Sequence, residues 1–372
     1  MELLEMARAH KNAGRHAEAV QAFKQVIDAS SGPNLLAEAL PSFQKVDAAE
    51  AERLARQALA QLPQHPLLEH HLGEALARQG RGAEAIPHFR SAVASSPVLA
   101  ELQGGGRAWT TLDPTVPCPA CGQSDGHPIW VGNASATQKH LGLIDPVKIW
   151  LRCDGCGLVR VPNPAPAERL DAWYQQTYAH GETHSPPSGS PLHQILGQYE
   201  NLLERVQRHR DERGGRLLEL GASWGLLMAT ARWQGFEVEG LELASKASAW
   251  GRERLGLKLR QGRIPEDLPS GSWDVIVMLE VIEHLSHPDT VLQALRSRLR
   301  RGGQLVLSTP LLDHPYHLVT GYEDPMWGVP GHLIYYDRRT LQEALERAGL
   351  RLLDWWSSPR HLGSGMVLAT PA

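Results

Sequence analysis

The segment at residues 217–225 constrains the fold of this chain more than any other part. Its sequence, Leu-Leu-Glu-Leu-Gly-Ala-Ser-Trp-Gly, is typical of a buried strand that passes through a tight glycine turn into a helix. A second strand is expected to end on Glu242, twenty-three residues after Glu219. A strand, glycine turn, helix, strand and terminal acid form a unit that grips the adenosine of a nucleotide-like cofactor. The segment therefore predicts a cofactor site in an α/β fold.

The residues around the glycine turn distinguish between two cofactors. A dinucleotide fingerprint G-x-G-x-x-G that begins at Gly221 requires glycine at positions 223 and 226, where this chain has Ser223 and Leu226. Glu219 lies two residues before the first glycine, and its carboxylate would repel a pyrophosphate. The same carboxylate is compatible with a cationic sulfonium that carries an ammonium group. We therefore expect S-adenosylmethionine (SAM), and not NAD, as the cofactor.

Size and charge limit the class of the protein. The chain has 372 residues, too many for one ordinary core, so two or three domains are expected. A net charge of -4 argues against an extended nucleic-acid surface. The sequence contains no run of about 18 apolar residues, and its start, Met-Glu-Leu-Leu-Glu-Met, lacks the pattern of a signal peptide. We therefore expect a soluble cytoplasmic protein without a membrane segment.

Residues 1–103 have a helical composition and contain an internal repeat. Glycine, alanine and phenylalanine recur at a spacing of 66 residues, and a degenerate middle copy fits at a spacing of 34. Such a period, with small residues at close helix contacts and a closing proline, resembles the tetratricopeptide (TPR) repeat, although a generic helical bundle is an alternative. Three repeats would hold a peptide, a partner protein or a second copy of the chain. The repeated positions are Gly14, Ala19, Phe23, Ala51, Ala55, Ala58, Pro63, Gly80, Ala85, Phe89, Ala92 and Pro97.

All 4 cysteines of the chain form two C-x-x-C-G pairs. In each pair the two thiolates point at one centre, and the glycine permits a tight turn. Two such pairs complete a closed tetrahedral site, so residues 107–165 are expected to form a module whose zinc supports folding and not chemistry. Iron or a redox pair is the alternative. The pairs are Cys118 with Cys121 and Cys153 with Cys156, and the insertion between them, a hairpin or a substrate-facing loop, includes Lys139, His140 and Lys148.

Residues 195–372 alternate short apolar runs with amphipathic stretches, which indicates a parallel sheet covered by helices on both faces. Residues 166–194 before it are expected to form a linker or a lid. The expected strands lie near 216–220, 237–242, 258–261, 273–279, 303–308, 350–356 and 364–370. The expected helices lie near 195–212, 225–234, 245–255, 288–300 and 338–348.

At this point the sequence resembles the class I SAM-dependent methyltransferases over roughly residues 115–370. The resemblance rests on Leu-Glu-Leu-Gly-Ala-Ser-Trp-Gly at 218–225, on the segment that ends in Glu-Val-Ile-Glu-His-Leu at 280–285, and on the segments 301–310 and 331–337. The cysteine segment is similar to a subgroup with a zinc ribbon before the methyltransferase domain, which includes the sugar C-methyltransferases of deoxysugar pathways. The family implies a Rossmann-like sheet of seven strands, the last one antiparallel.

The resemblance also implies roles for the residues of the glycine turn. Gly221, Ser223 and Gly225 would let the backbone approach the methionine end of SAM. Glu219 would help to hold the ammonium group of the cofactor. Ser223 replaces a glycine that is common in the family.

Three further residues are implied at the cofactor by the same resemblance. Glu242 would accept hydrogen bonds from the ribose hydroxyls, and Glu280, at the end of the fourth strand of the sheet, would lie beside the sulfonium. Arg263 and its neighbours would edge the adenine, at a position where many relatives have an acid.

Two histidines are candidates for catalysis. Methyl transfer is an in-line displacement, in which the enzyme aligns a nucleophile and, for most nucleophiles, removes a proton. His332 occupies the place of the second histidine in the H-E-H-x-x-Y-F segment of the sugar C-methyltransferases, which implies a base; packing or substrate orientation is the alternative. Gly331 stands where those enzymes have a glutamate. His284 is a family signature in a loop near SAM, with a structural role as the alternative to catalysis.

The sequence therefore predicts a SAM-dependent methyltransferase that acts on a sugar, another small metabolite, or a group borne by a carrier or peptide. An RNA methyltransferase is one alternative, although the net charge and the lack of a basic and aromatic stripe argue against it. A TPR scaffold with a non-catalytic methyltransferase fold is the other, although a mere scaffold would need neither Glu219 nor Glu242. The sequence does not specify the acceptor atom, the oligomeric state or the partner of the repeats.

Overall fold

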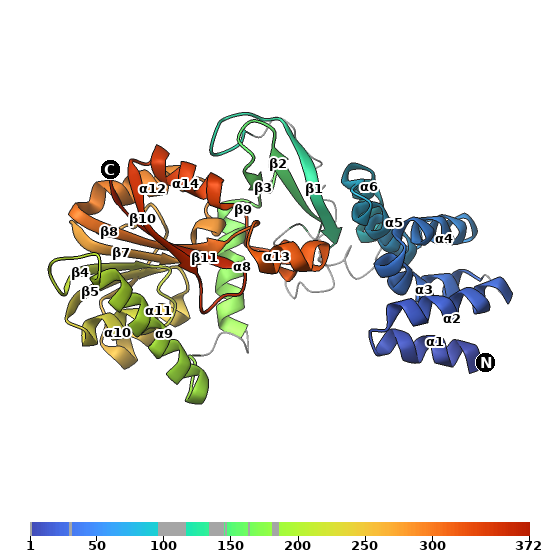
Figure 1. The fold of residues 1–372 in the computed structure, drawn as a ribbon, viewed down its shortest axis with the longest axis horizontal. Helices are drawn as coiled ribbons and strands as arrows, with labels where there is room; N and C mark the ends of the chain where they lie inside the picture. Colours follow the sequence, from blue (N-terminus) through green and yellow to red (C-terminus); the bar gives the residue numbers. More distant parts are fainter. Residues whose placement is uncertain are drawn as a thin grey trace.

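The computed structural model of the chain describes residues 2–29, 32–95, 117–133, 145, 147–162, 164–180 and 186–372. Figure 1 shows three parts along its longest axis: helices at the amino-terminal end, a small sheet in the middle and a large sheet at the other end. Within these ranges no helix is long and apolar enough to cross a membrane. The predicted boundaries at 103 and 107, and the residues Lys139 and His140, lie outside the described residues.

The described residues from 2 to 95 fold into six helices, and each helix packs against the next. The repeated small residues lie at the close contacts, because Ala19, Ala51 and Ala85 are fully buried. A Cβ on Gly73 would lie 2.9 Å from the ring of Phe89, so this contact requires glycine. The assignment to TPR repeats stays a prediction. The helices are α1 (Glu2–Asn12), α2 (His16–Ala29), α3 (Pro33–Val46), α4 (Ala48–Gln61), α5 (Pro66–Arg78) and α6 (Gly82–Ala94).

The small sheet has four antiparallel strands in the order β1-β2-β3-β9. The strands are β1 (Gly126–Asn133), β2 (Val147–Cys153), β3 (Val159–Arg160) and β9 (Ile334–Tyr335). The insertion between the cysteine pairs therefore supplies a hairpin. The last strand comes from the third region of the sequence, so the cysteine module and the large domain share one sheet.

Alternate side chains of β2 face opposite sides of the small sheet, as in any strand. Ile149 and Leu151 belong to the same core as the amino-terminal helices, and α5 and α6 both contact β1. Trp150 packs on the other face with Trp327 and Tyr335 of the carboxyl-terminal region. The hairpin thus lies between the helices and the large domain (Figure 1).

The large sheet has seven strands in the order β10-β11-β8-β7-β4-β5-β6. Strand β11 is antiparallel to both of its neighbours, and the other pairings are parallel. The seven predicted strands and the antiparallel last strand are confirmed, although β8 begins earlier and ends later than predicted. The strands are β4 (Gly215–Leu220), β5 (Phe236–Glu242), β6 (Leu259–Gln261), β7 (Trp273–Leu279), β8 (Leu299–Pro310), β10 (Leu350–Ser357) and β11 (Ser364–Pro371).

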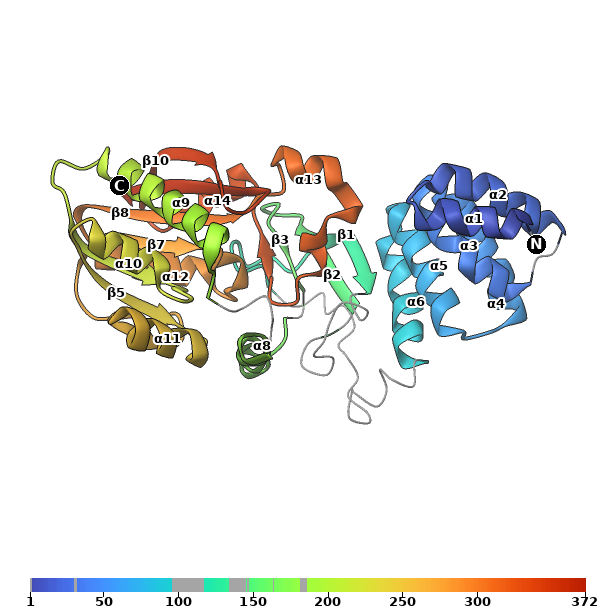
Figure 2. The same cartoon turned by 90° about the horizontal axis from the view of Figure 1, so that it is seen from below.

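Helices cover both faces of the large sheet, as its buried parallel strands require. Helix α9 begins at Gly189, earlier than predicted, because Pro191 is tolerated in a first helical turn that needs no N–H donor there. The predicted linker or lid at 166–194 therefore contains helix α8 and the start of α9; Figure 2 shows α8 at the rim of the large sheet. The helices are α8 (Ala167–His180), α9 (Gly189–Gln207), α10 (Leu226–Trp233), α11 (Ser245–Leu255), α12 (Pro288–Arg298), α13 (Pro315–Thr320) and α14 (Arg338–Arg347), with short 3-10 turns η2 (Ile282–His284), η3 (Gly321–Glu323) and η4 (Pro325–Gly328).

Candidate active site

The turn between β4 and α10 keeps its shape because glycine occupies two left-handed positions. Gly221 has a φ of +69° and Gly225 a φ of +76°. A Cβ on Gly221 would lie 2.4 Å from Cγ2 of Val281, so a larger side chain does not fit there. Ser223 also adopts a left-handed conformation, with a φ of +48°. Such backbone costs on the order of 1–3 kcal/mol outside glycine and is commonly kept at binding sites.

Glu242 ties this turn to the end of β5. One carboxylate oxygen accepts a hydrogen bond from the N–H of Ser223 at 2.7 Å, and the other accepts one from the N–H of Ala244 at 2.7 Å. The side chain is buried, and burial raises the pKa of this carboxyl group. Each carboxylate oxygen retains a second lone pair, which a ligand hydroxyl is able to use.

Glu219 lies beneath the same turn. Its carboxylate accepts a hydrogen bond from the N–H of Met228, in the first turns of α10, at 3.2 Å. Burial raises the pKa of Glu219 well above its ordinary value, and Glu242 nearby raises it further. A cation bound at the turn would stabilise the ionised form of both carboxylates, since an opposite charge offsets the cost of burial.

Arg263 connects two segments at the rim of the site, a role that the sequence did not reveal. Its guanidinium forms an ion pair with Asp171 of α8, and its backbone N–H donates to the carboxylate of Asp267 at 2.8 Å. The side chain therefore joins α8 to the loop after β6. Helix α8 is fixed on the same side by Gln175, whose amide donates to the carbonyl of Leu243 at 2.7 Å.

Glu280 follows β7 directly and is held by two hydroxyl groups. Ser308 at the end of β8 donates to one carboxylate oxygen at 2.6 Å, and Ser364 at the start of β11 donates to the other at 2.8 Å. Glu280 has a left-handed φ of +53°, which turns the chain at the carboxyl edge of the sheet. Burial raises the pKa of its carboxyl group. Ligands of open α/β sheets bind at this edge.

Glu283, His284 and His332 lie together, each with one ligand atom within 4.8 Å of the others, and Glu280 is close enough to Glu283 to raise the pKa of its carboxyl group. The Nδ1 of His284 donates to the carbonyl of Gly331 at 2.9 Å. The Nδ1 of His332 lies 2.6 Å from the hydroxyl of Tyr335, which itself donates to a carbonyl and therefore accepts from the histidine. This hydrogen-bond network assigns a lone pair to both Nε2 atoms.

The third member of this cluster, Glu283, is fully buried, and its Oε1 has no hydrogen-bond partner within the described structure. Its other oxygen accepts from the hydroxyl of Thr309 at 3.0 Å. Burial lowers the pKa of His284 to about 4 and that of His332 well below its ordinary value, and it raises the pKa of Glu283. Three acceptor atoms therefore face one another, and a proton on Glu283 or a cation would satisfy them.

Two residues that the sequence did not single out for this role position the histidines. Lys148 of β2 is buried, and its ammonium donates to the carbonyls of Val329, Pro330 and His332 at 3.2, 3.1 and 2.7 Å. Tyr174 of α8 bonds to Nδ1 of His284. Sequence reasoning could not find these contacts, because the partners lie more than 100 positions apart in the chain.

Close packing explains why position 331 is glycine. A Cβ on Gly331 would lie 2.9 Å from the ring of Trp173, 2.9 Å from the hydroxyl of Tyr174 and 3.1 Å from Nδ1 of His284. A glutamate, which the sugar C-methyltransferases carry at this place, fits here only if the side chains of Trp173 and Tyr174 move.

The four cysteines form one cluster at the end of the small sheet, as their spacing predicts. The Sγ atoms of Cys118 and Cys156 lie 3.6 Å apart, and those of Cys121 and Cys153 lie 3.5 Å apart. A tetrahedral zinc site with Zn–S bonds of about 2.3 Å places its sulfur atoms about 3.8 Å apart, so the cluster has the size that zinc requires. The glycines that follow each pair, Gly122 and Gly157, have left-handed φ values of +76° and +78°.

Comparisons with known proteins agree with this geometry. A family model described as "Methyltransferase domain" matches residues 192–354. The ubiquinone biosynthesis O-methyltransferase of Nitrosococcus oceani is 30% identical over 126 residues, which cover 32% of this chain and 52% of that protein. The enzyme of the same name from Pseudomonas aeruginosa is 30% identical over 131 residues, 32% of this chain and 53% of that protein. The chain thus spans about half the length of the curated relatives it matches.

Solved structures of methyltransferases are also similar to this chain. One is the magnesium protoporphyrin IX methyltransferase of Synechocystis with bound SAH, at 14% identity and a TM-score of 0.43 over 55% of this chain and 100% of that one. Another is a SAM-bound amino pentose methyltransferase from Micromonospora echinaspora, at 19% identity and a TM-score of 0.40 over 51% of this chain and 100% of that one.

The family match falls within the third region of the sequence. Residues 192–354 match a methyltransferase domain, and the sheet of this region continues beyond the match to β11. The amino-terminal helices and the small cysteine sheet lie outside the matched residues.

Proposed function

We propose that the chain is a SAM-dependent methyltransferase whose cofactor lies over the carboxyl ends of β4, β5 and β7. The observation that carries this proposal is Glu242, which holds the glycine turn by backbone hydrogen bonds and keeps lone pairs for two ribose hydroxyls. Glu219 would hold the ammonium group of the methionine end, and Glu280 would face the sulfonium. Gly221, Ser223 and Gly225 would give the backbone close access to the cofactor, and Arg263 would close the adenine side through Asp171.

SAM supplies an electrophilic methyl group on a positively charged sulfur. Two buried carboxylates, Glu219 and Glu242, beside one glycine turn fit a ligand of that charge, since each is costly to ionise without a cation nearby. Glu280 adds a third acidic group at the carboxyl edge, where its two serine partners fix the orientation of the carboxyl group.

We infer that the acceptor atom is an oxygen. The curated relatives that match the chain are named O-methyltransferases. The glutamate that accompanies carbon methylation in the sugar enzymes is replaced by Gly331, and the side chains of Trp173 and Tyr174 occupy the space next to it. An acceptor hydroxyl is compatible with all the substrates considered: a sugar, another small metabolite, or a group borne by a carrier or peptide.

His332 is the proposed base, with His284 as its neighbour and support. The acceptor hydroxyl would form a bond to the methyl carbon while the bond from that carbon to sulfur breaks and sulfur keeps the electron pair. The hydroxyl proton would pass to Nε2 of His332, which carries a lone pair. Its low pKa keeps this nitrogen unprotonated at neutral pH.

The four cysteines are proposed to bind one structural zinc ion that supports β2 and the ends of the small sheet. Thiolates suit zinc, and four of them would fill its tetrahedral coordination shell, which leaves no open position for a substrate. Arg339 of α14 links the module to the large domain, because it donates to the carbonyl of Cys156 at 3.0 Å. The amino-terminal helices are proposed to present a carrier, a peptide or a second copy of the chain to this assembly.

The test of the function is formation of S-adenosylhomocysteine (SAH) from SAM in the presence of a panel of hydroxyl-bearing acceptors, including cell extract with and without nuclease. We expect turnover that resists nuclease, and a fall in kcat of roughly 10²–10⁴-fold in His332→Gln with unchanged SAM binding. Turnover that nuclease abolishes would replace this function with RNA methylation. Normal turnover by His332→Gln would remove the histidine from the reaction.

A further inference from the structure

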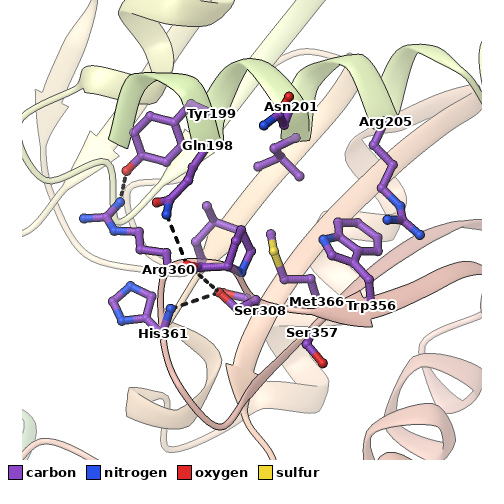
Figure 3. Close-up of a pocket in the computed structure, with 14 residues that line it drawn as sticks. Gln198, Tyr199, Asn201, Arg205, Ser308, Trp356, Ser357, Arg360, His361 and Met366 are labelled. Atoms are coloured by element: carbon purple, nitrogen blue, oxygen red, sulfur yellow. Dashed lines mark hydrogen bonds between the residues drawn. The ribbon is translucent and has the colours of Figure 1, made fainter. Parts of the chain in front are cut away.

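A cavity of about 240 Å³ opens between α9 and the hairpin formed by β10 and β11 (Figure 3). One wall comes from α9, the opposite wall from the hairpin and its loop, and the floor from the ends of β7 and β8. Its lining includes Tyr199, Asn201, Ser308, Trp356, Arg360 and Met366.

The floor of this cavity reaches the proposed site of methyl transfer. Ser308 lines the cavity and also donates a hydrogen bond to Glu280 at 2.6 Å. No residue of the glycine turn at 221–225 is among the described residues that line it. The cavity is therefore adjacent to the expected cofactor site and distinct from it. In an open α/β sheet both substrates meet at the carboxyl edge of the strands.

The walls of the cavity favour a flat apolar group. Tyr199 on α9 faces the hairpin, which contributes Trp356 and Met366, and Leu202, Leu279 and Pro359 add to the apolar lining. An apolar cavity of about 150 Å³ accepts benzene, so a space of 240 Å³ has room for a ring with small substituents.

The polar groups of the cavity favour a negatively charged or hydrogen-bond-accepting substituent. None of its 14 described lining residues is an aspartate or a glutamate. Arg205 is paired with Asp354 through contacts of 2.6 and 3.0 Å, and it stacks on Trp356. Arg360 lies over the ring of Tyr199 and bonds to its hydroxyl at the mouth of the cavity, which places a second guanidinium beside any ligand that enters.

We propose that this cavity binds the methyl acceptor, and that the acceptor is a mainly apolar ring with a carboxylate or a similar anionic group. The ring lies between Tyr199 and Met366, and the anionic group faces Arg360. This inference rests on the proposed methyl transfer and names its substrate class.

The test uses benzoate as the probe and benzyl alcohol as its uncharged counterpart, with full-length protein saturated with SAH. Saturation-transfer NMR and calorimetry give the affinity of each. Asn201→Trp, which fills the mouth of the cavity, is expected to weaken benzoate binding by at least about tenfold, whereas Glu200→Trp, on the same helix but outside the lining, changes it by less than about twofold. Arg360→Met is expected to weaken benzoate by about tenfold and Arg360→Lys by much less.

Each outcome decides one question. Benzoate affinity that Asn201→Trp leaves unchanged overturns the cavity as the acceptor site. Equal affinity for benzyl alcohol, or no binding of benzoate to a protein that binds SAH normally, overturns the substrate class; both outcomes leave the proposed function standing. Failure to bind SAH in the first place counts against the proposed function itself.

Discussion

The glycine-turn side of the site and its histidine side are held in place in different ways. On the first side, β4, the turn and β5 follow one another within 28 residues, and Glu242 and Glu219 bond to backbone N–H groups of the same unit. On the second side, His284 and His332 come from separate loops and depend on Lys148 of β2 and Tyr174 of α8. The cofactor side is thus a local structure, whereas the catalytic side is assembled from distant parts of the chain.

This difference has a functional consequence. Strand β2, which carries Lys148, packs on the amino-terminal helices through Ile149 and Leu151 and ends at Cys153 in the cysteine cluster. A change in the metal site or in the helices should therefore disturb the histidines more than the glycine turn. Predictions that separate the two sides test this account.

The largest effect is expected from the metal site. Cys153→Ser removes one of four thiolates, so the protein should lose its zinc and its apparent melting temperature should fall by roughly 10 °C. SAM affinity should change by less than about threefold, because the glycine turn is held locally. Metal analysis, thermal unfolding and calorimetry measure the three quantities, with Asp154→Asn, an exposed neighbour, as the control. Full zinc retention in Cys153→Ser would refute the four-cysteine site.

On the cofactor side, Glu242→Ala should weaken SAM binding by at least about 100-fold, since two hydrogen bonds to a charged group are lost. The metal content should stay unchanged, whereas the melting temperature should fall by several degrees, because the N–H groups of Ser223 and Ala244 lose their acceptor. Glu237→Ala, at an exposed position of the same strand, is the matched control and should bind normally. Unchanged affinity in Glu242→Ala would contradict the cofactor assignment.

The free energy of unfolding should depend on pH through the histidine side of the site. His284 has a pKa of about 4 in the folded chain because of burial, against 6.5 for an exposed histidine. The unfolded chain therefore takes up a proton first as pH falls, and stability drops below pH 6.5. Between pH 6.5 and 5 the loss should be about 2 kcal/mol. Denaturant unfolding at both pH values measures it, and His284→Gln should flatten the profile; an equally steep profile in that variant would assign the effect elsewhere.

The smallest effect is expected at the rim. Arg263→Ala breaks an exposed ion pair with Asp171, and such pairs contribute about 0–1 kcal/mol. SAM affinity should therefore fall by no more than about threefold, as calorimetry would show against the control Arg260→Ala, another partly exposed arginine of the same region. A loss of tenfold or more would mean that Arg263 contacts the adenine directly.

Much of the fold could be predicted from the sequence, because each strand of the large sheet is a short apolar run with its own boundaries. The glycine turn was predictable because glycine occupies two of its three left-handed positions, Gly221 and Gly225, although the third, Ser223, gave no such signal. The spacing of the cysteines likewise predicted their cluster, since the two pairs are each local turns.

The parts that the sequence did not reveal are contacts between distant residues. Strand β9 is two residues long and pairs with β3 across more than 170 positions, which leaves no periodic pattern to read. Lysine is a residue type that is usually exposed to solvent, but Lys148 is buried and its ammonium group contacts backbone carbonyls. The reason for Gly331 became visible only when α8 and His284 were placed against it.

The central claim is that the carboxyl edge of the large sheet binds SAM. Titration of the full-length protein with SAM and SAH by calorimetry, on a sample of known zinc content, tests it most directly. We predict one site per chain with micromolar affinity, roughly −8 kcal/mol, for at least one of the two. A folded, zinc-containing protein that binds neither would contradict the account and leave the methyltransferase fold as a scaffold.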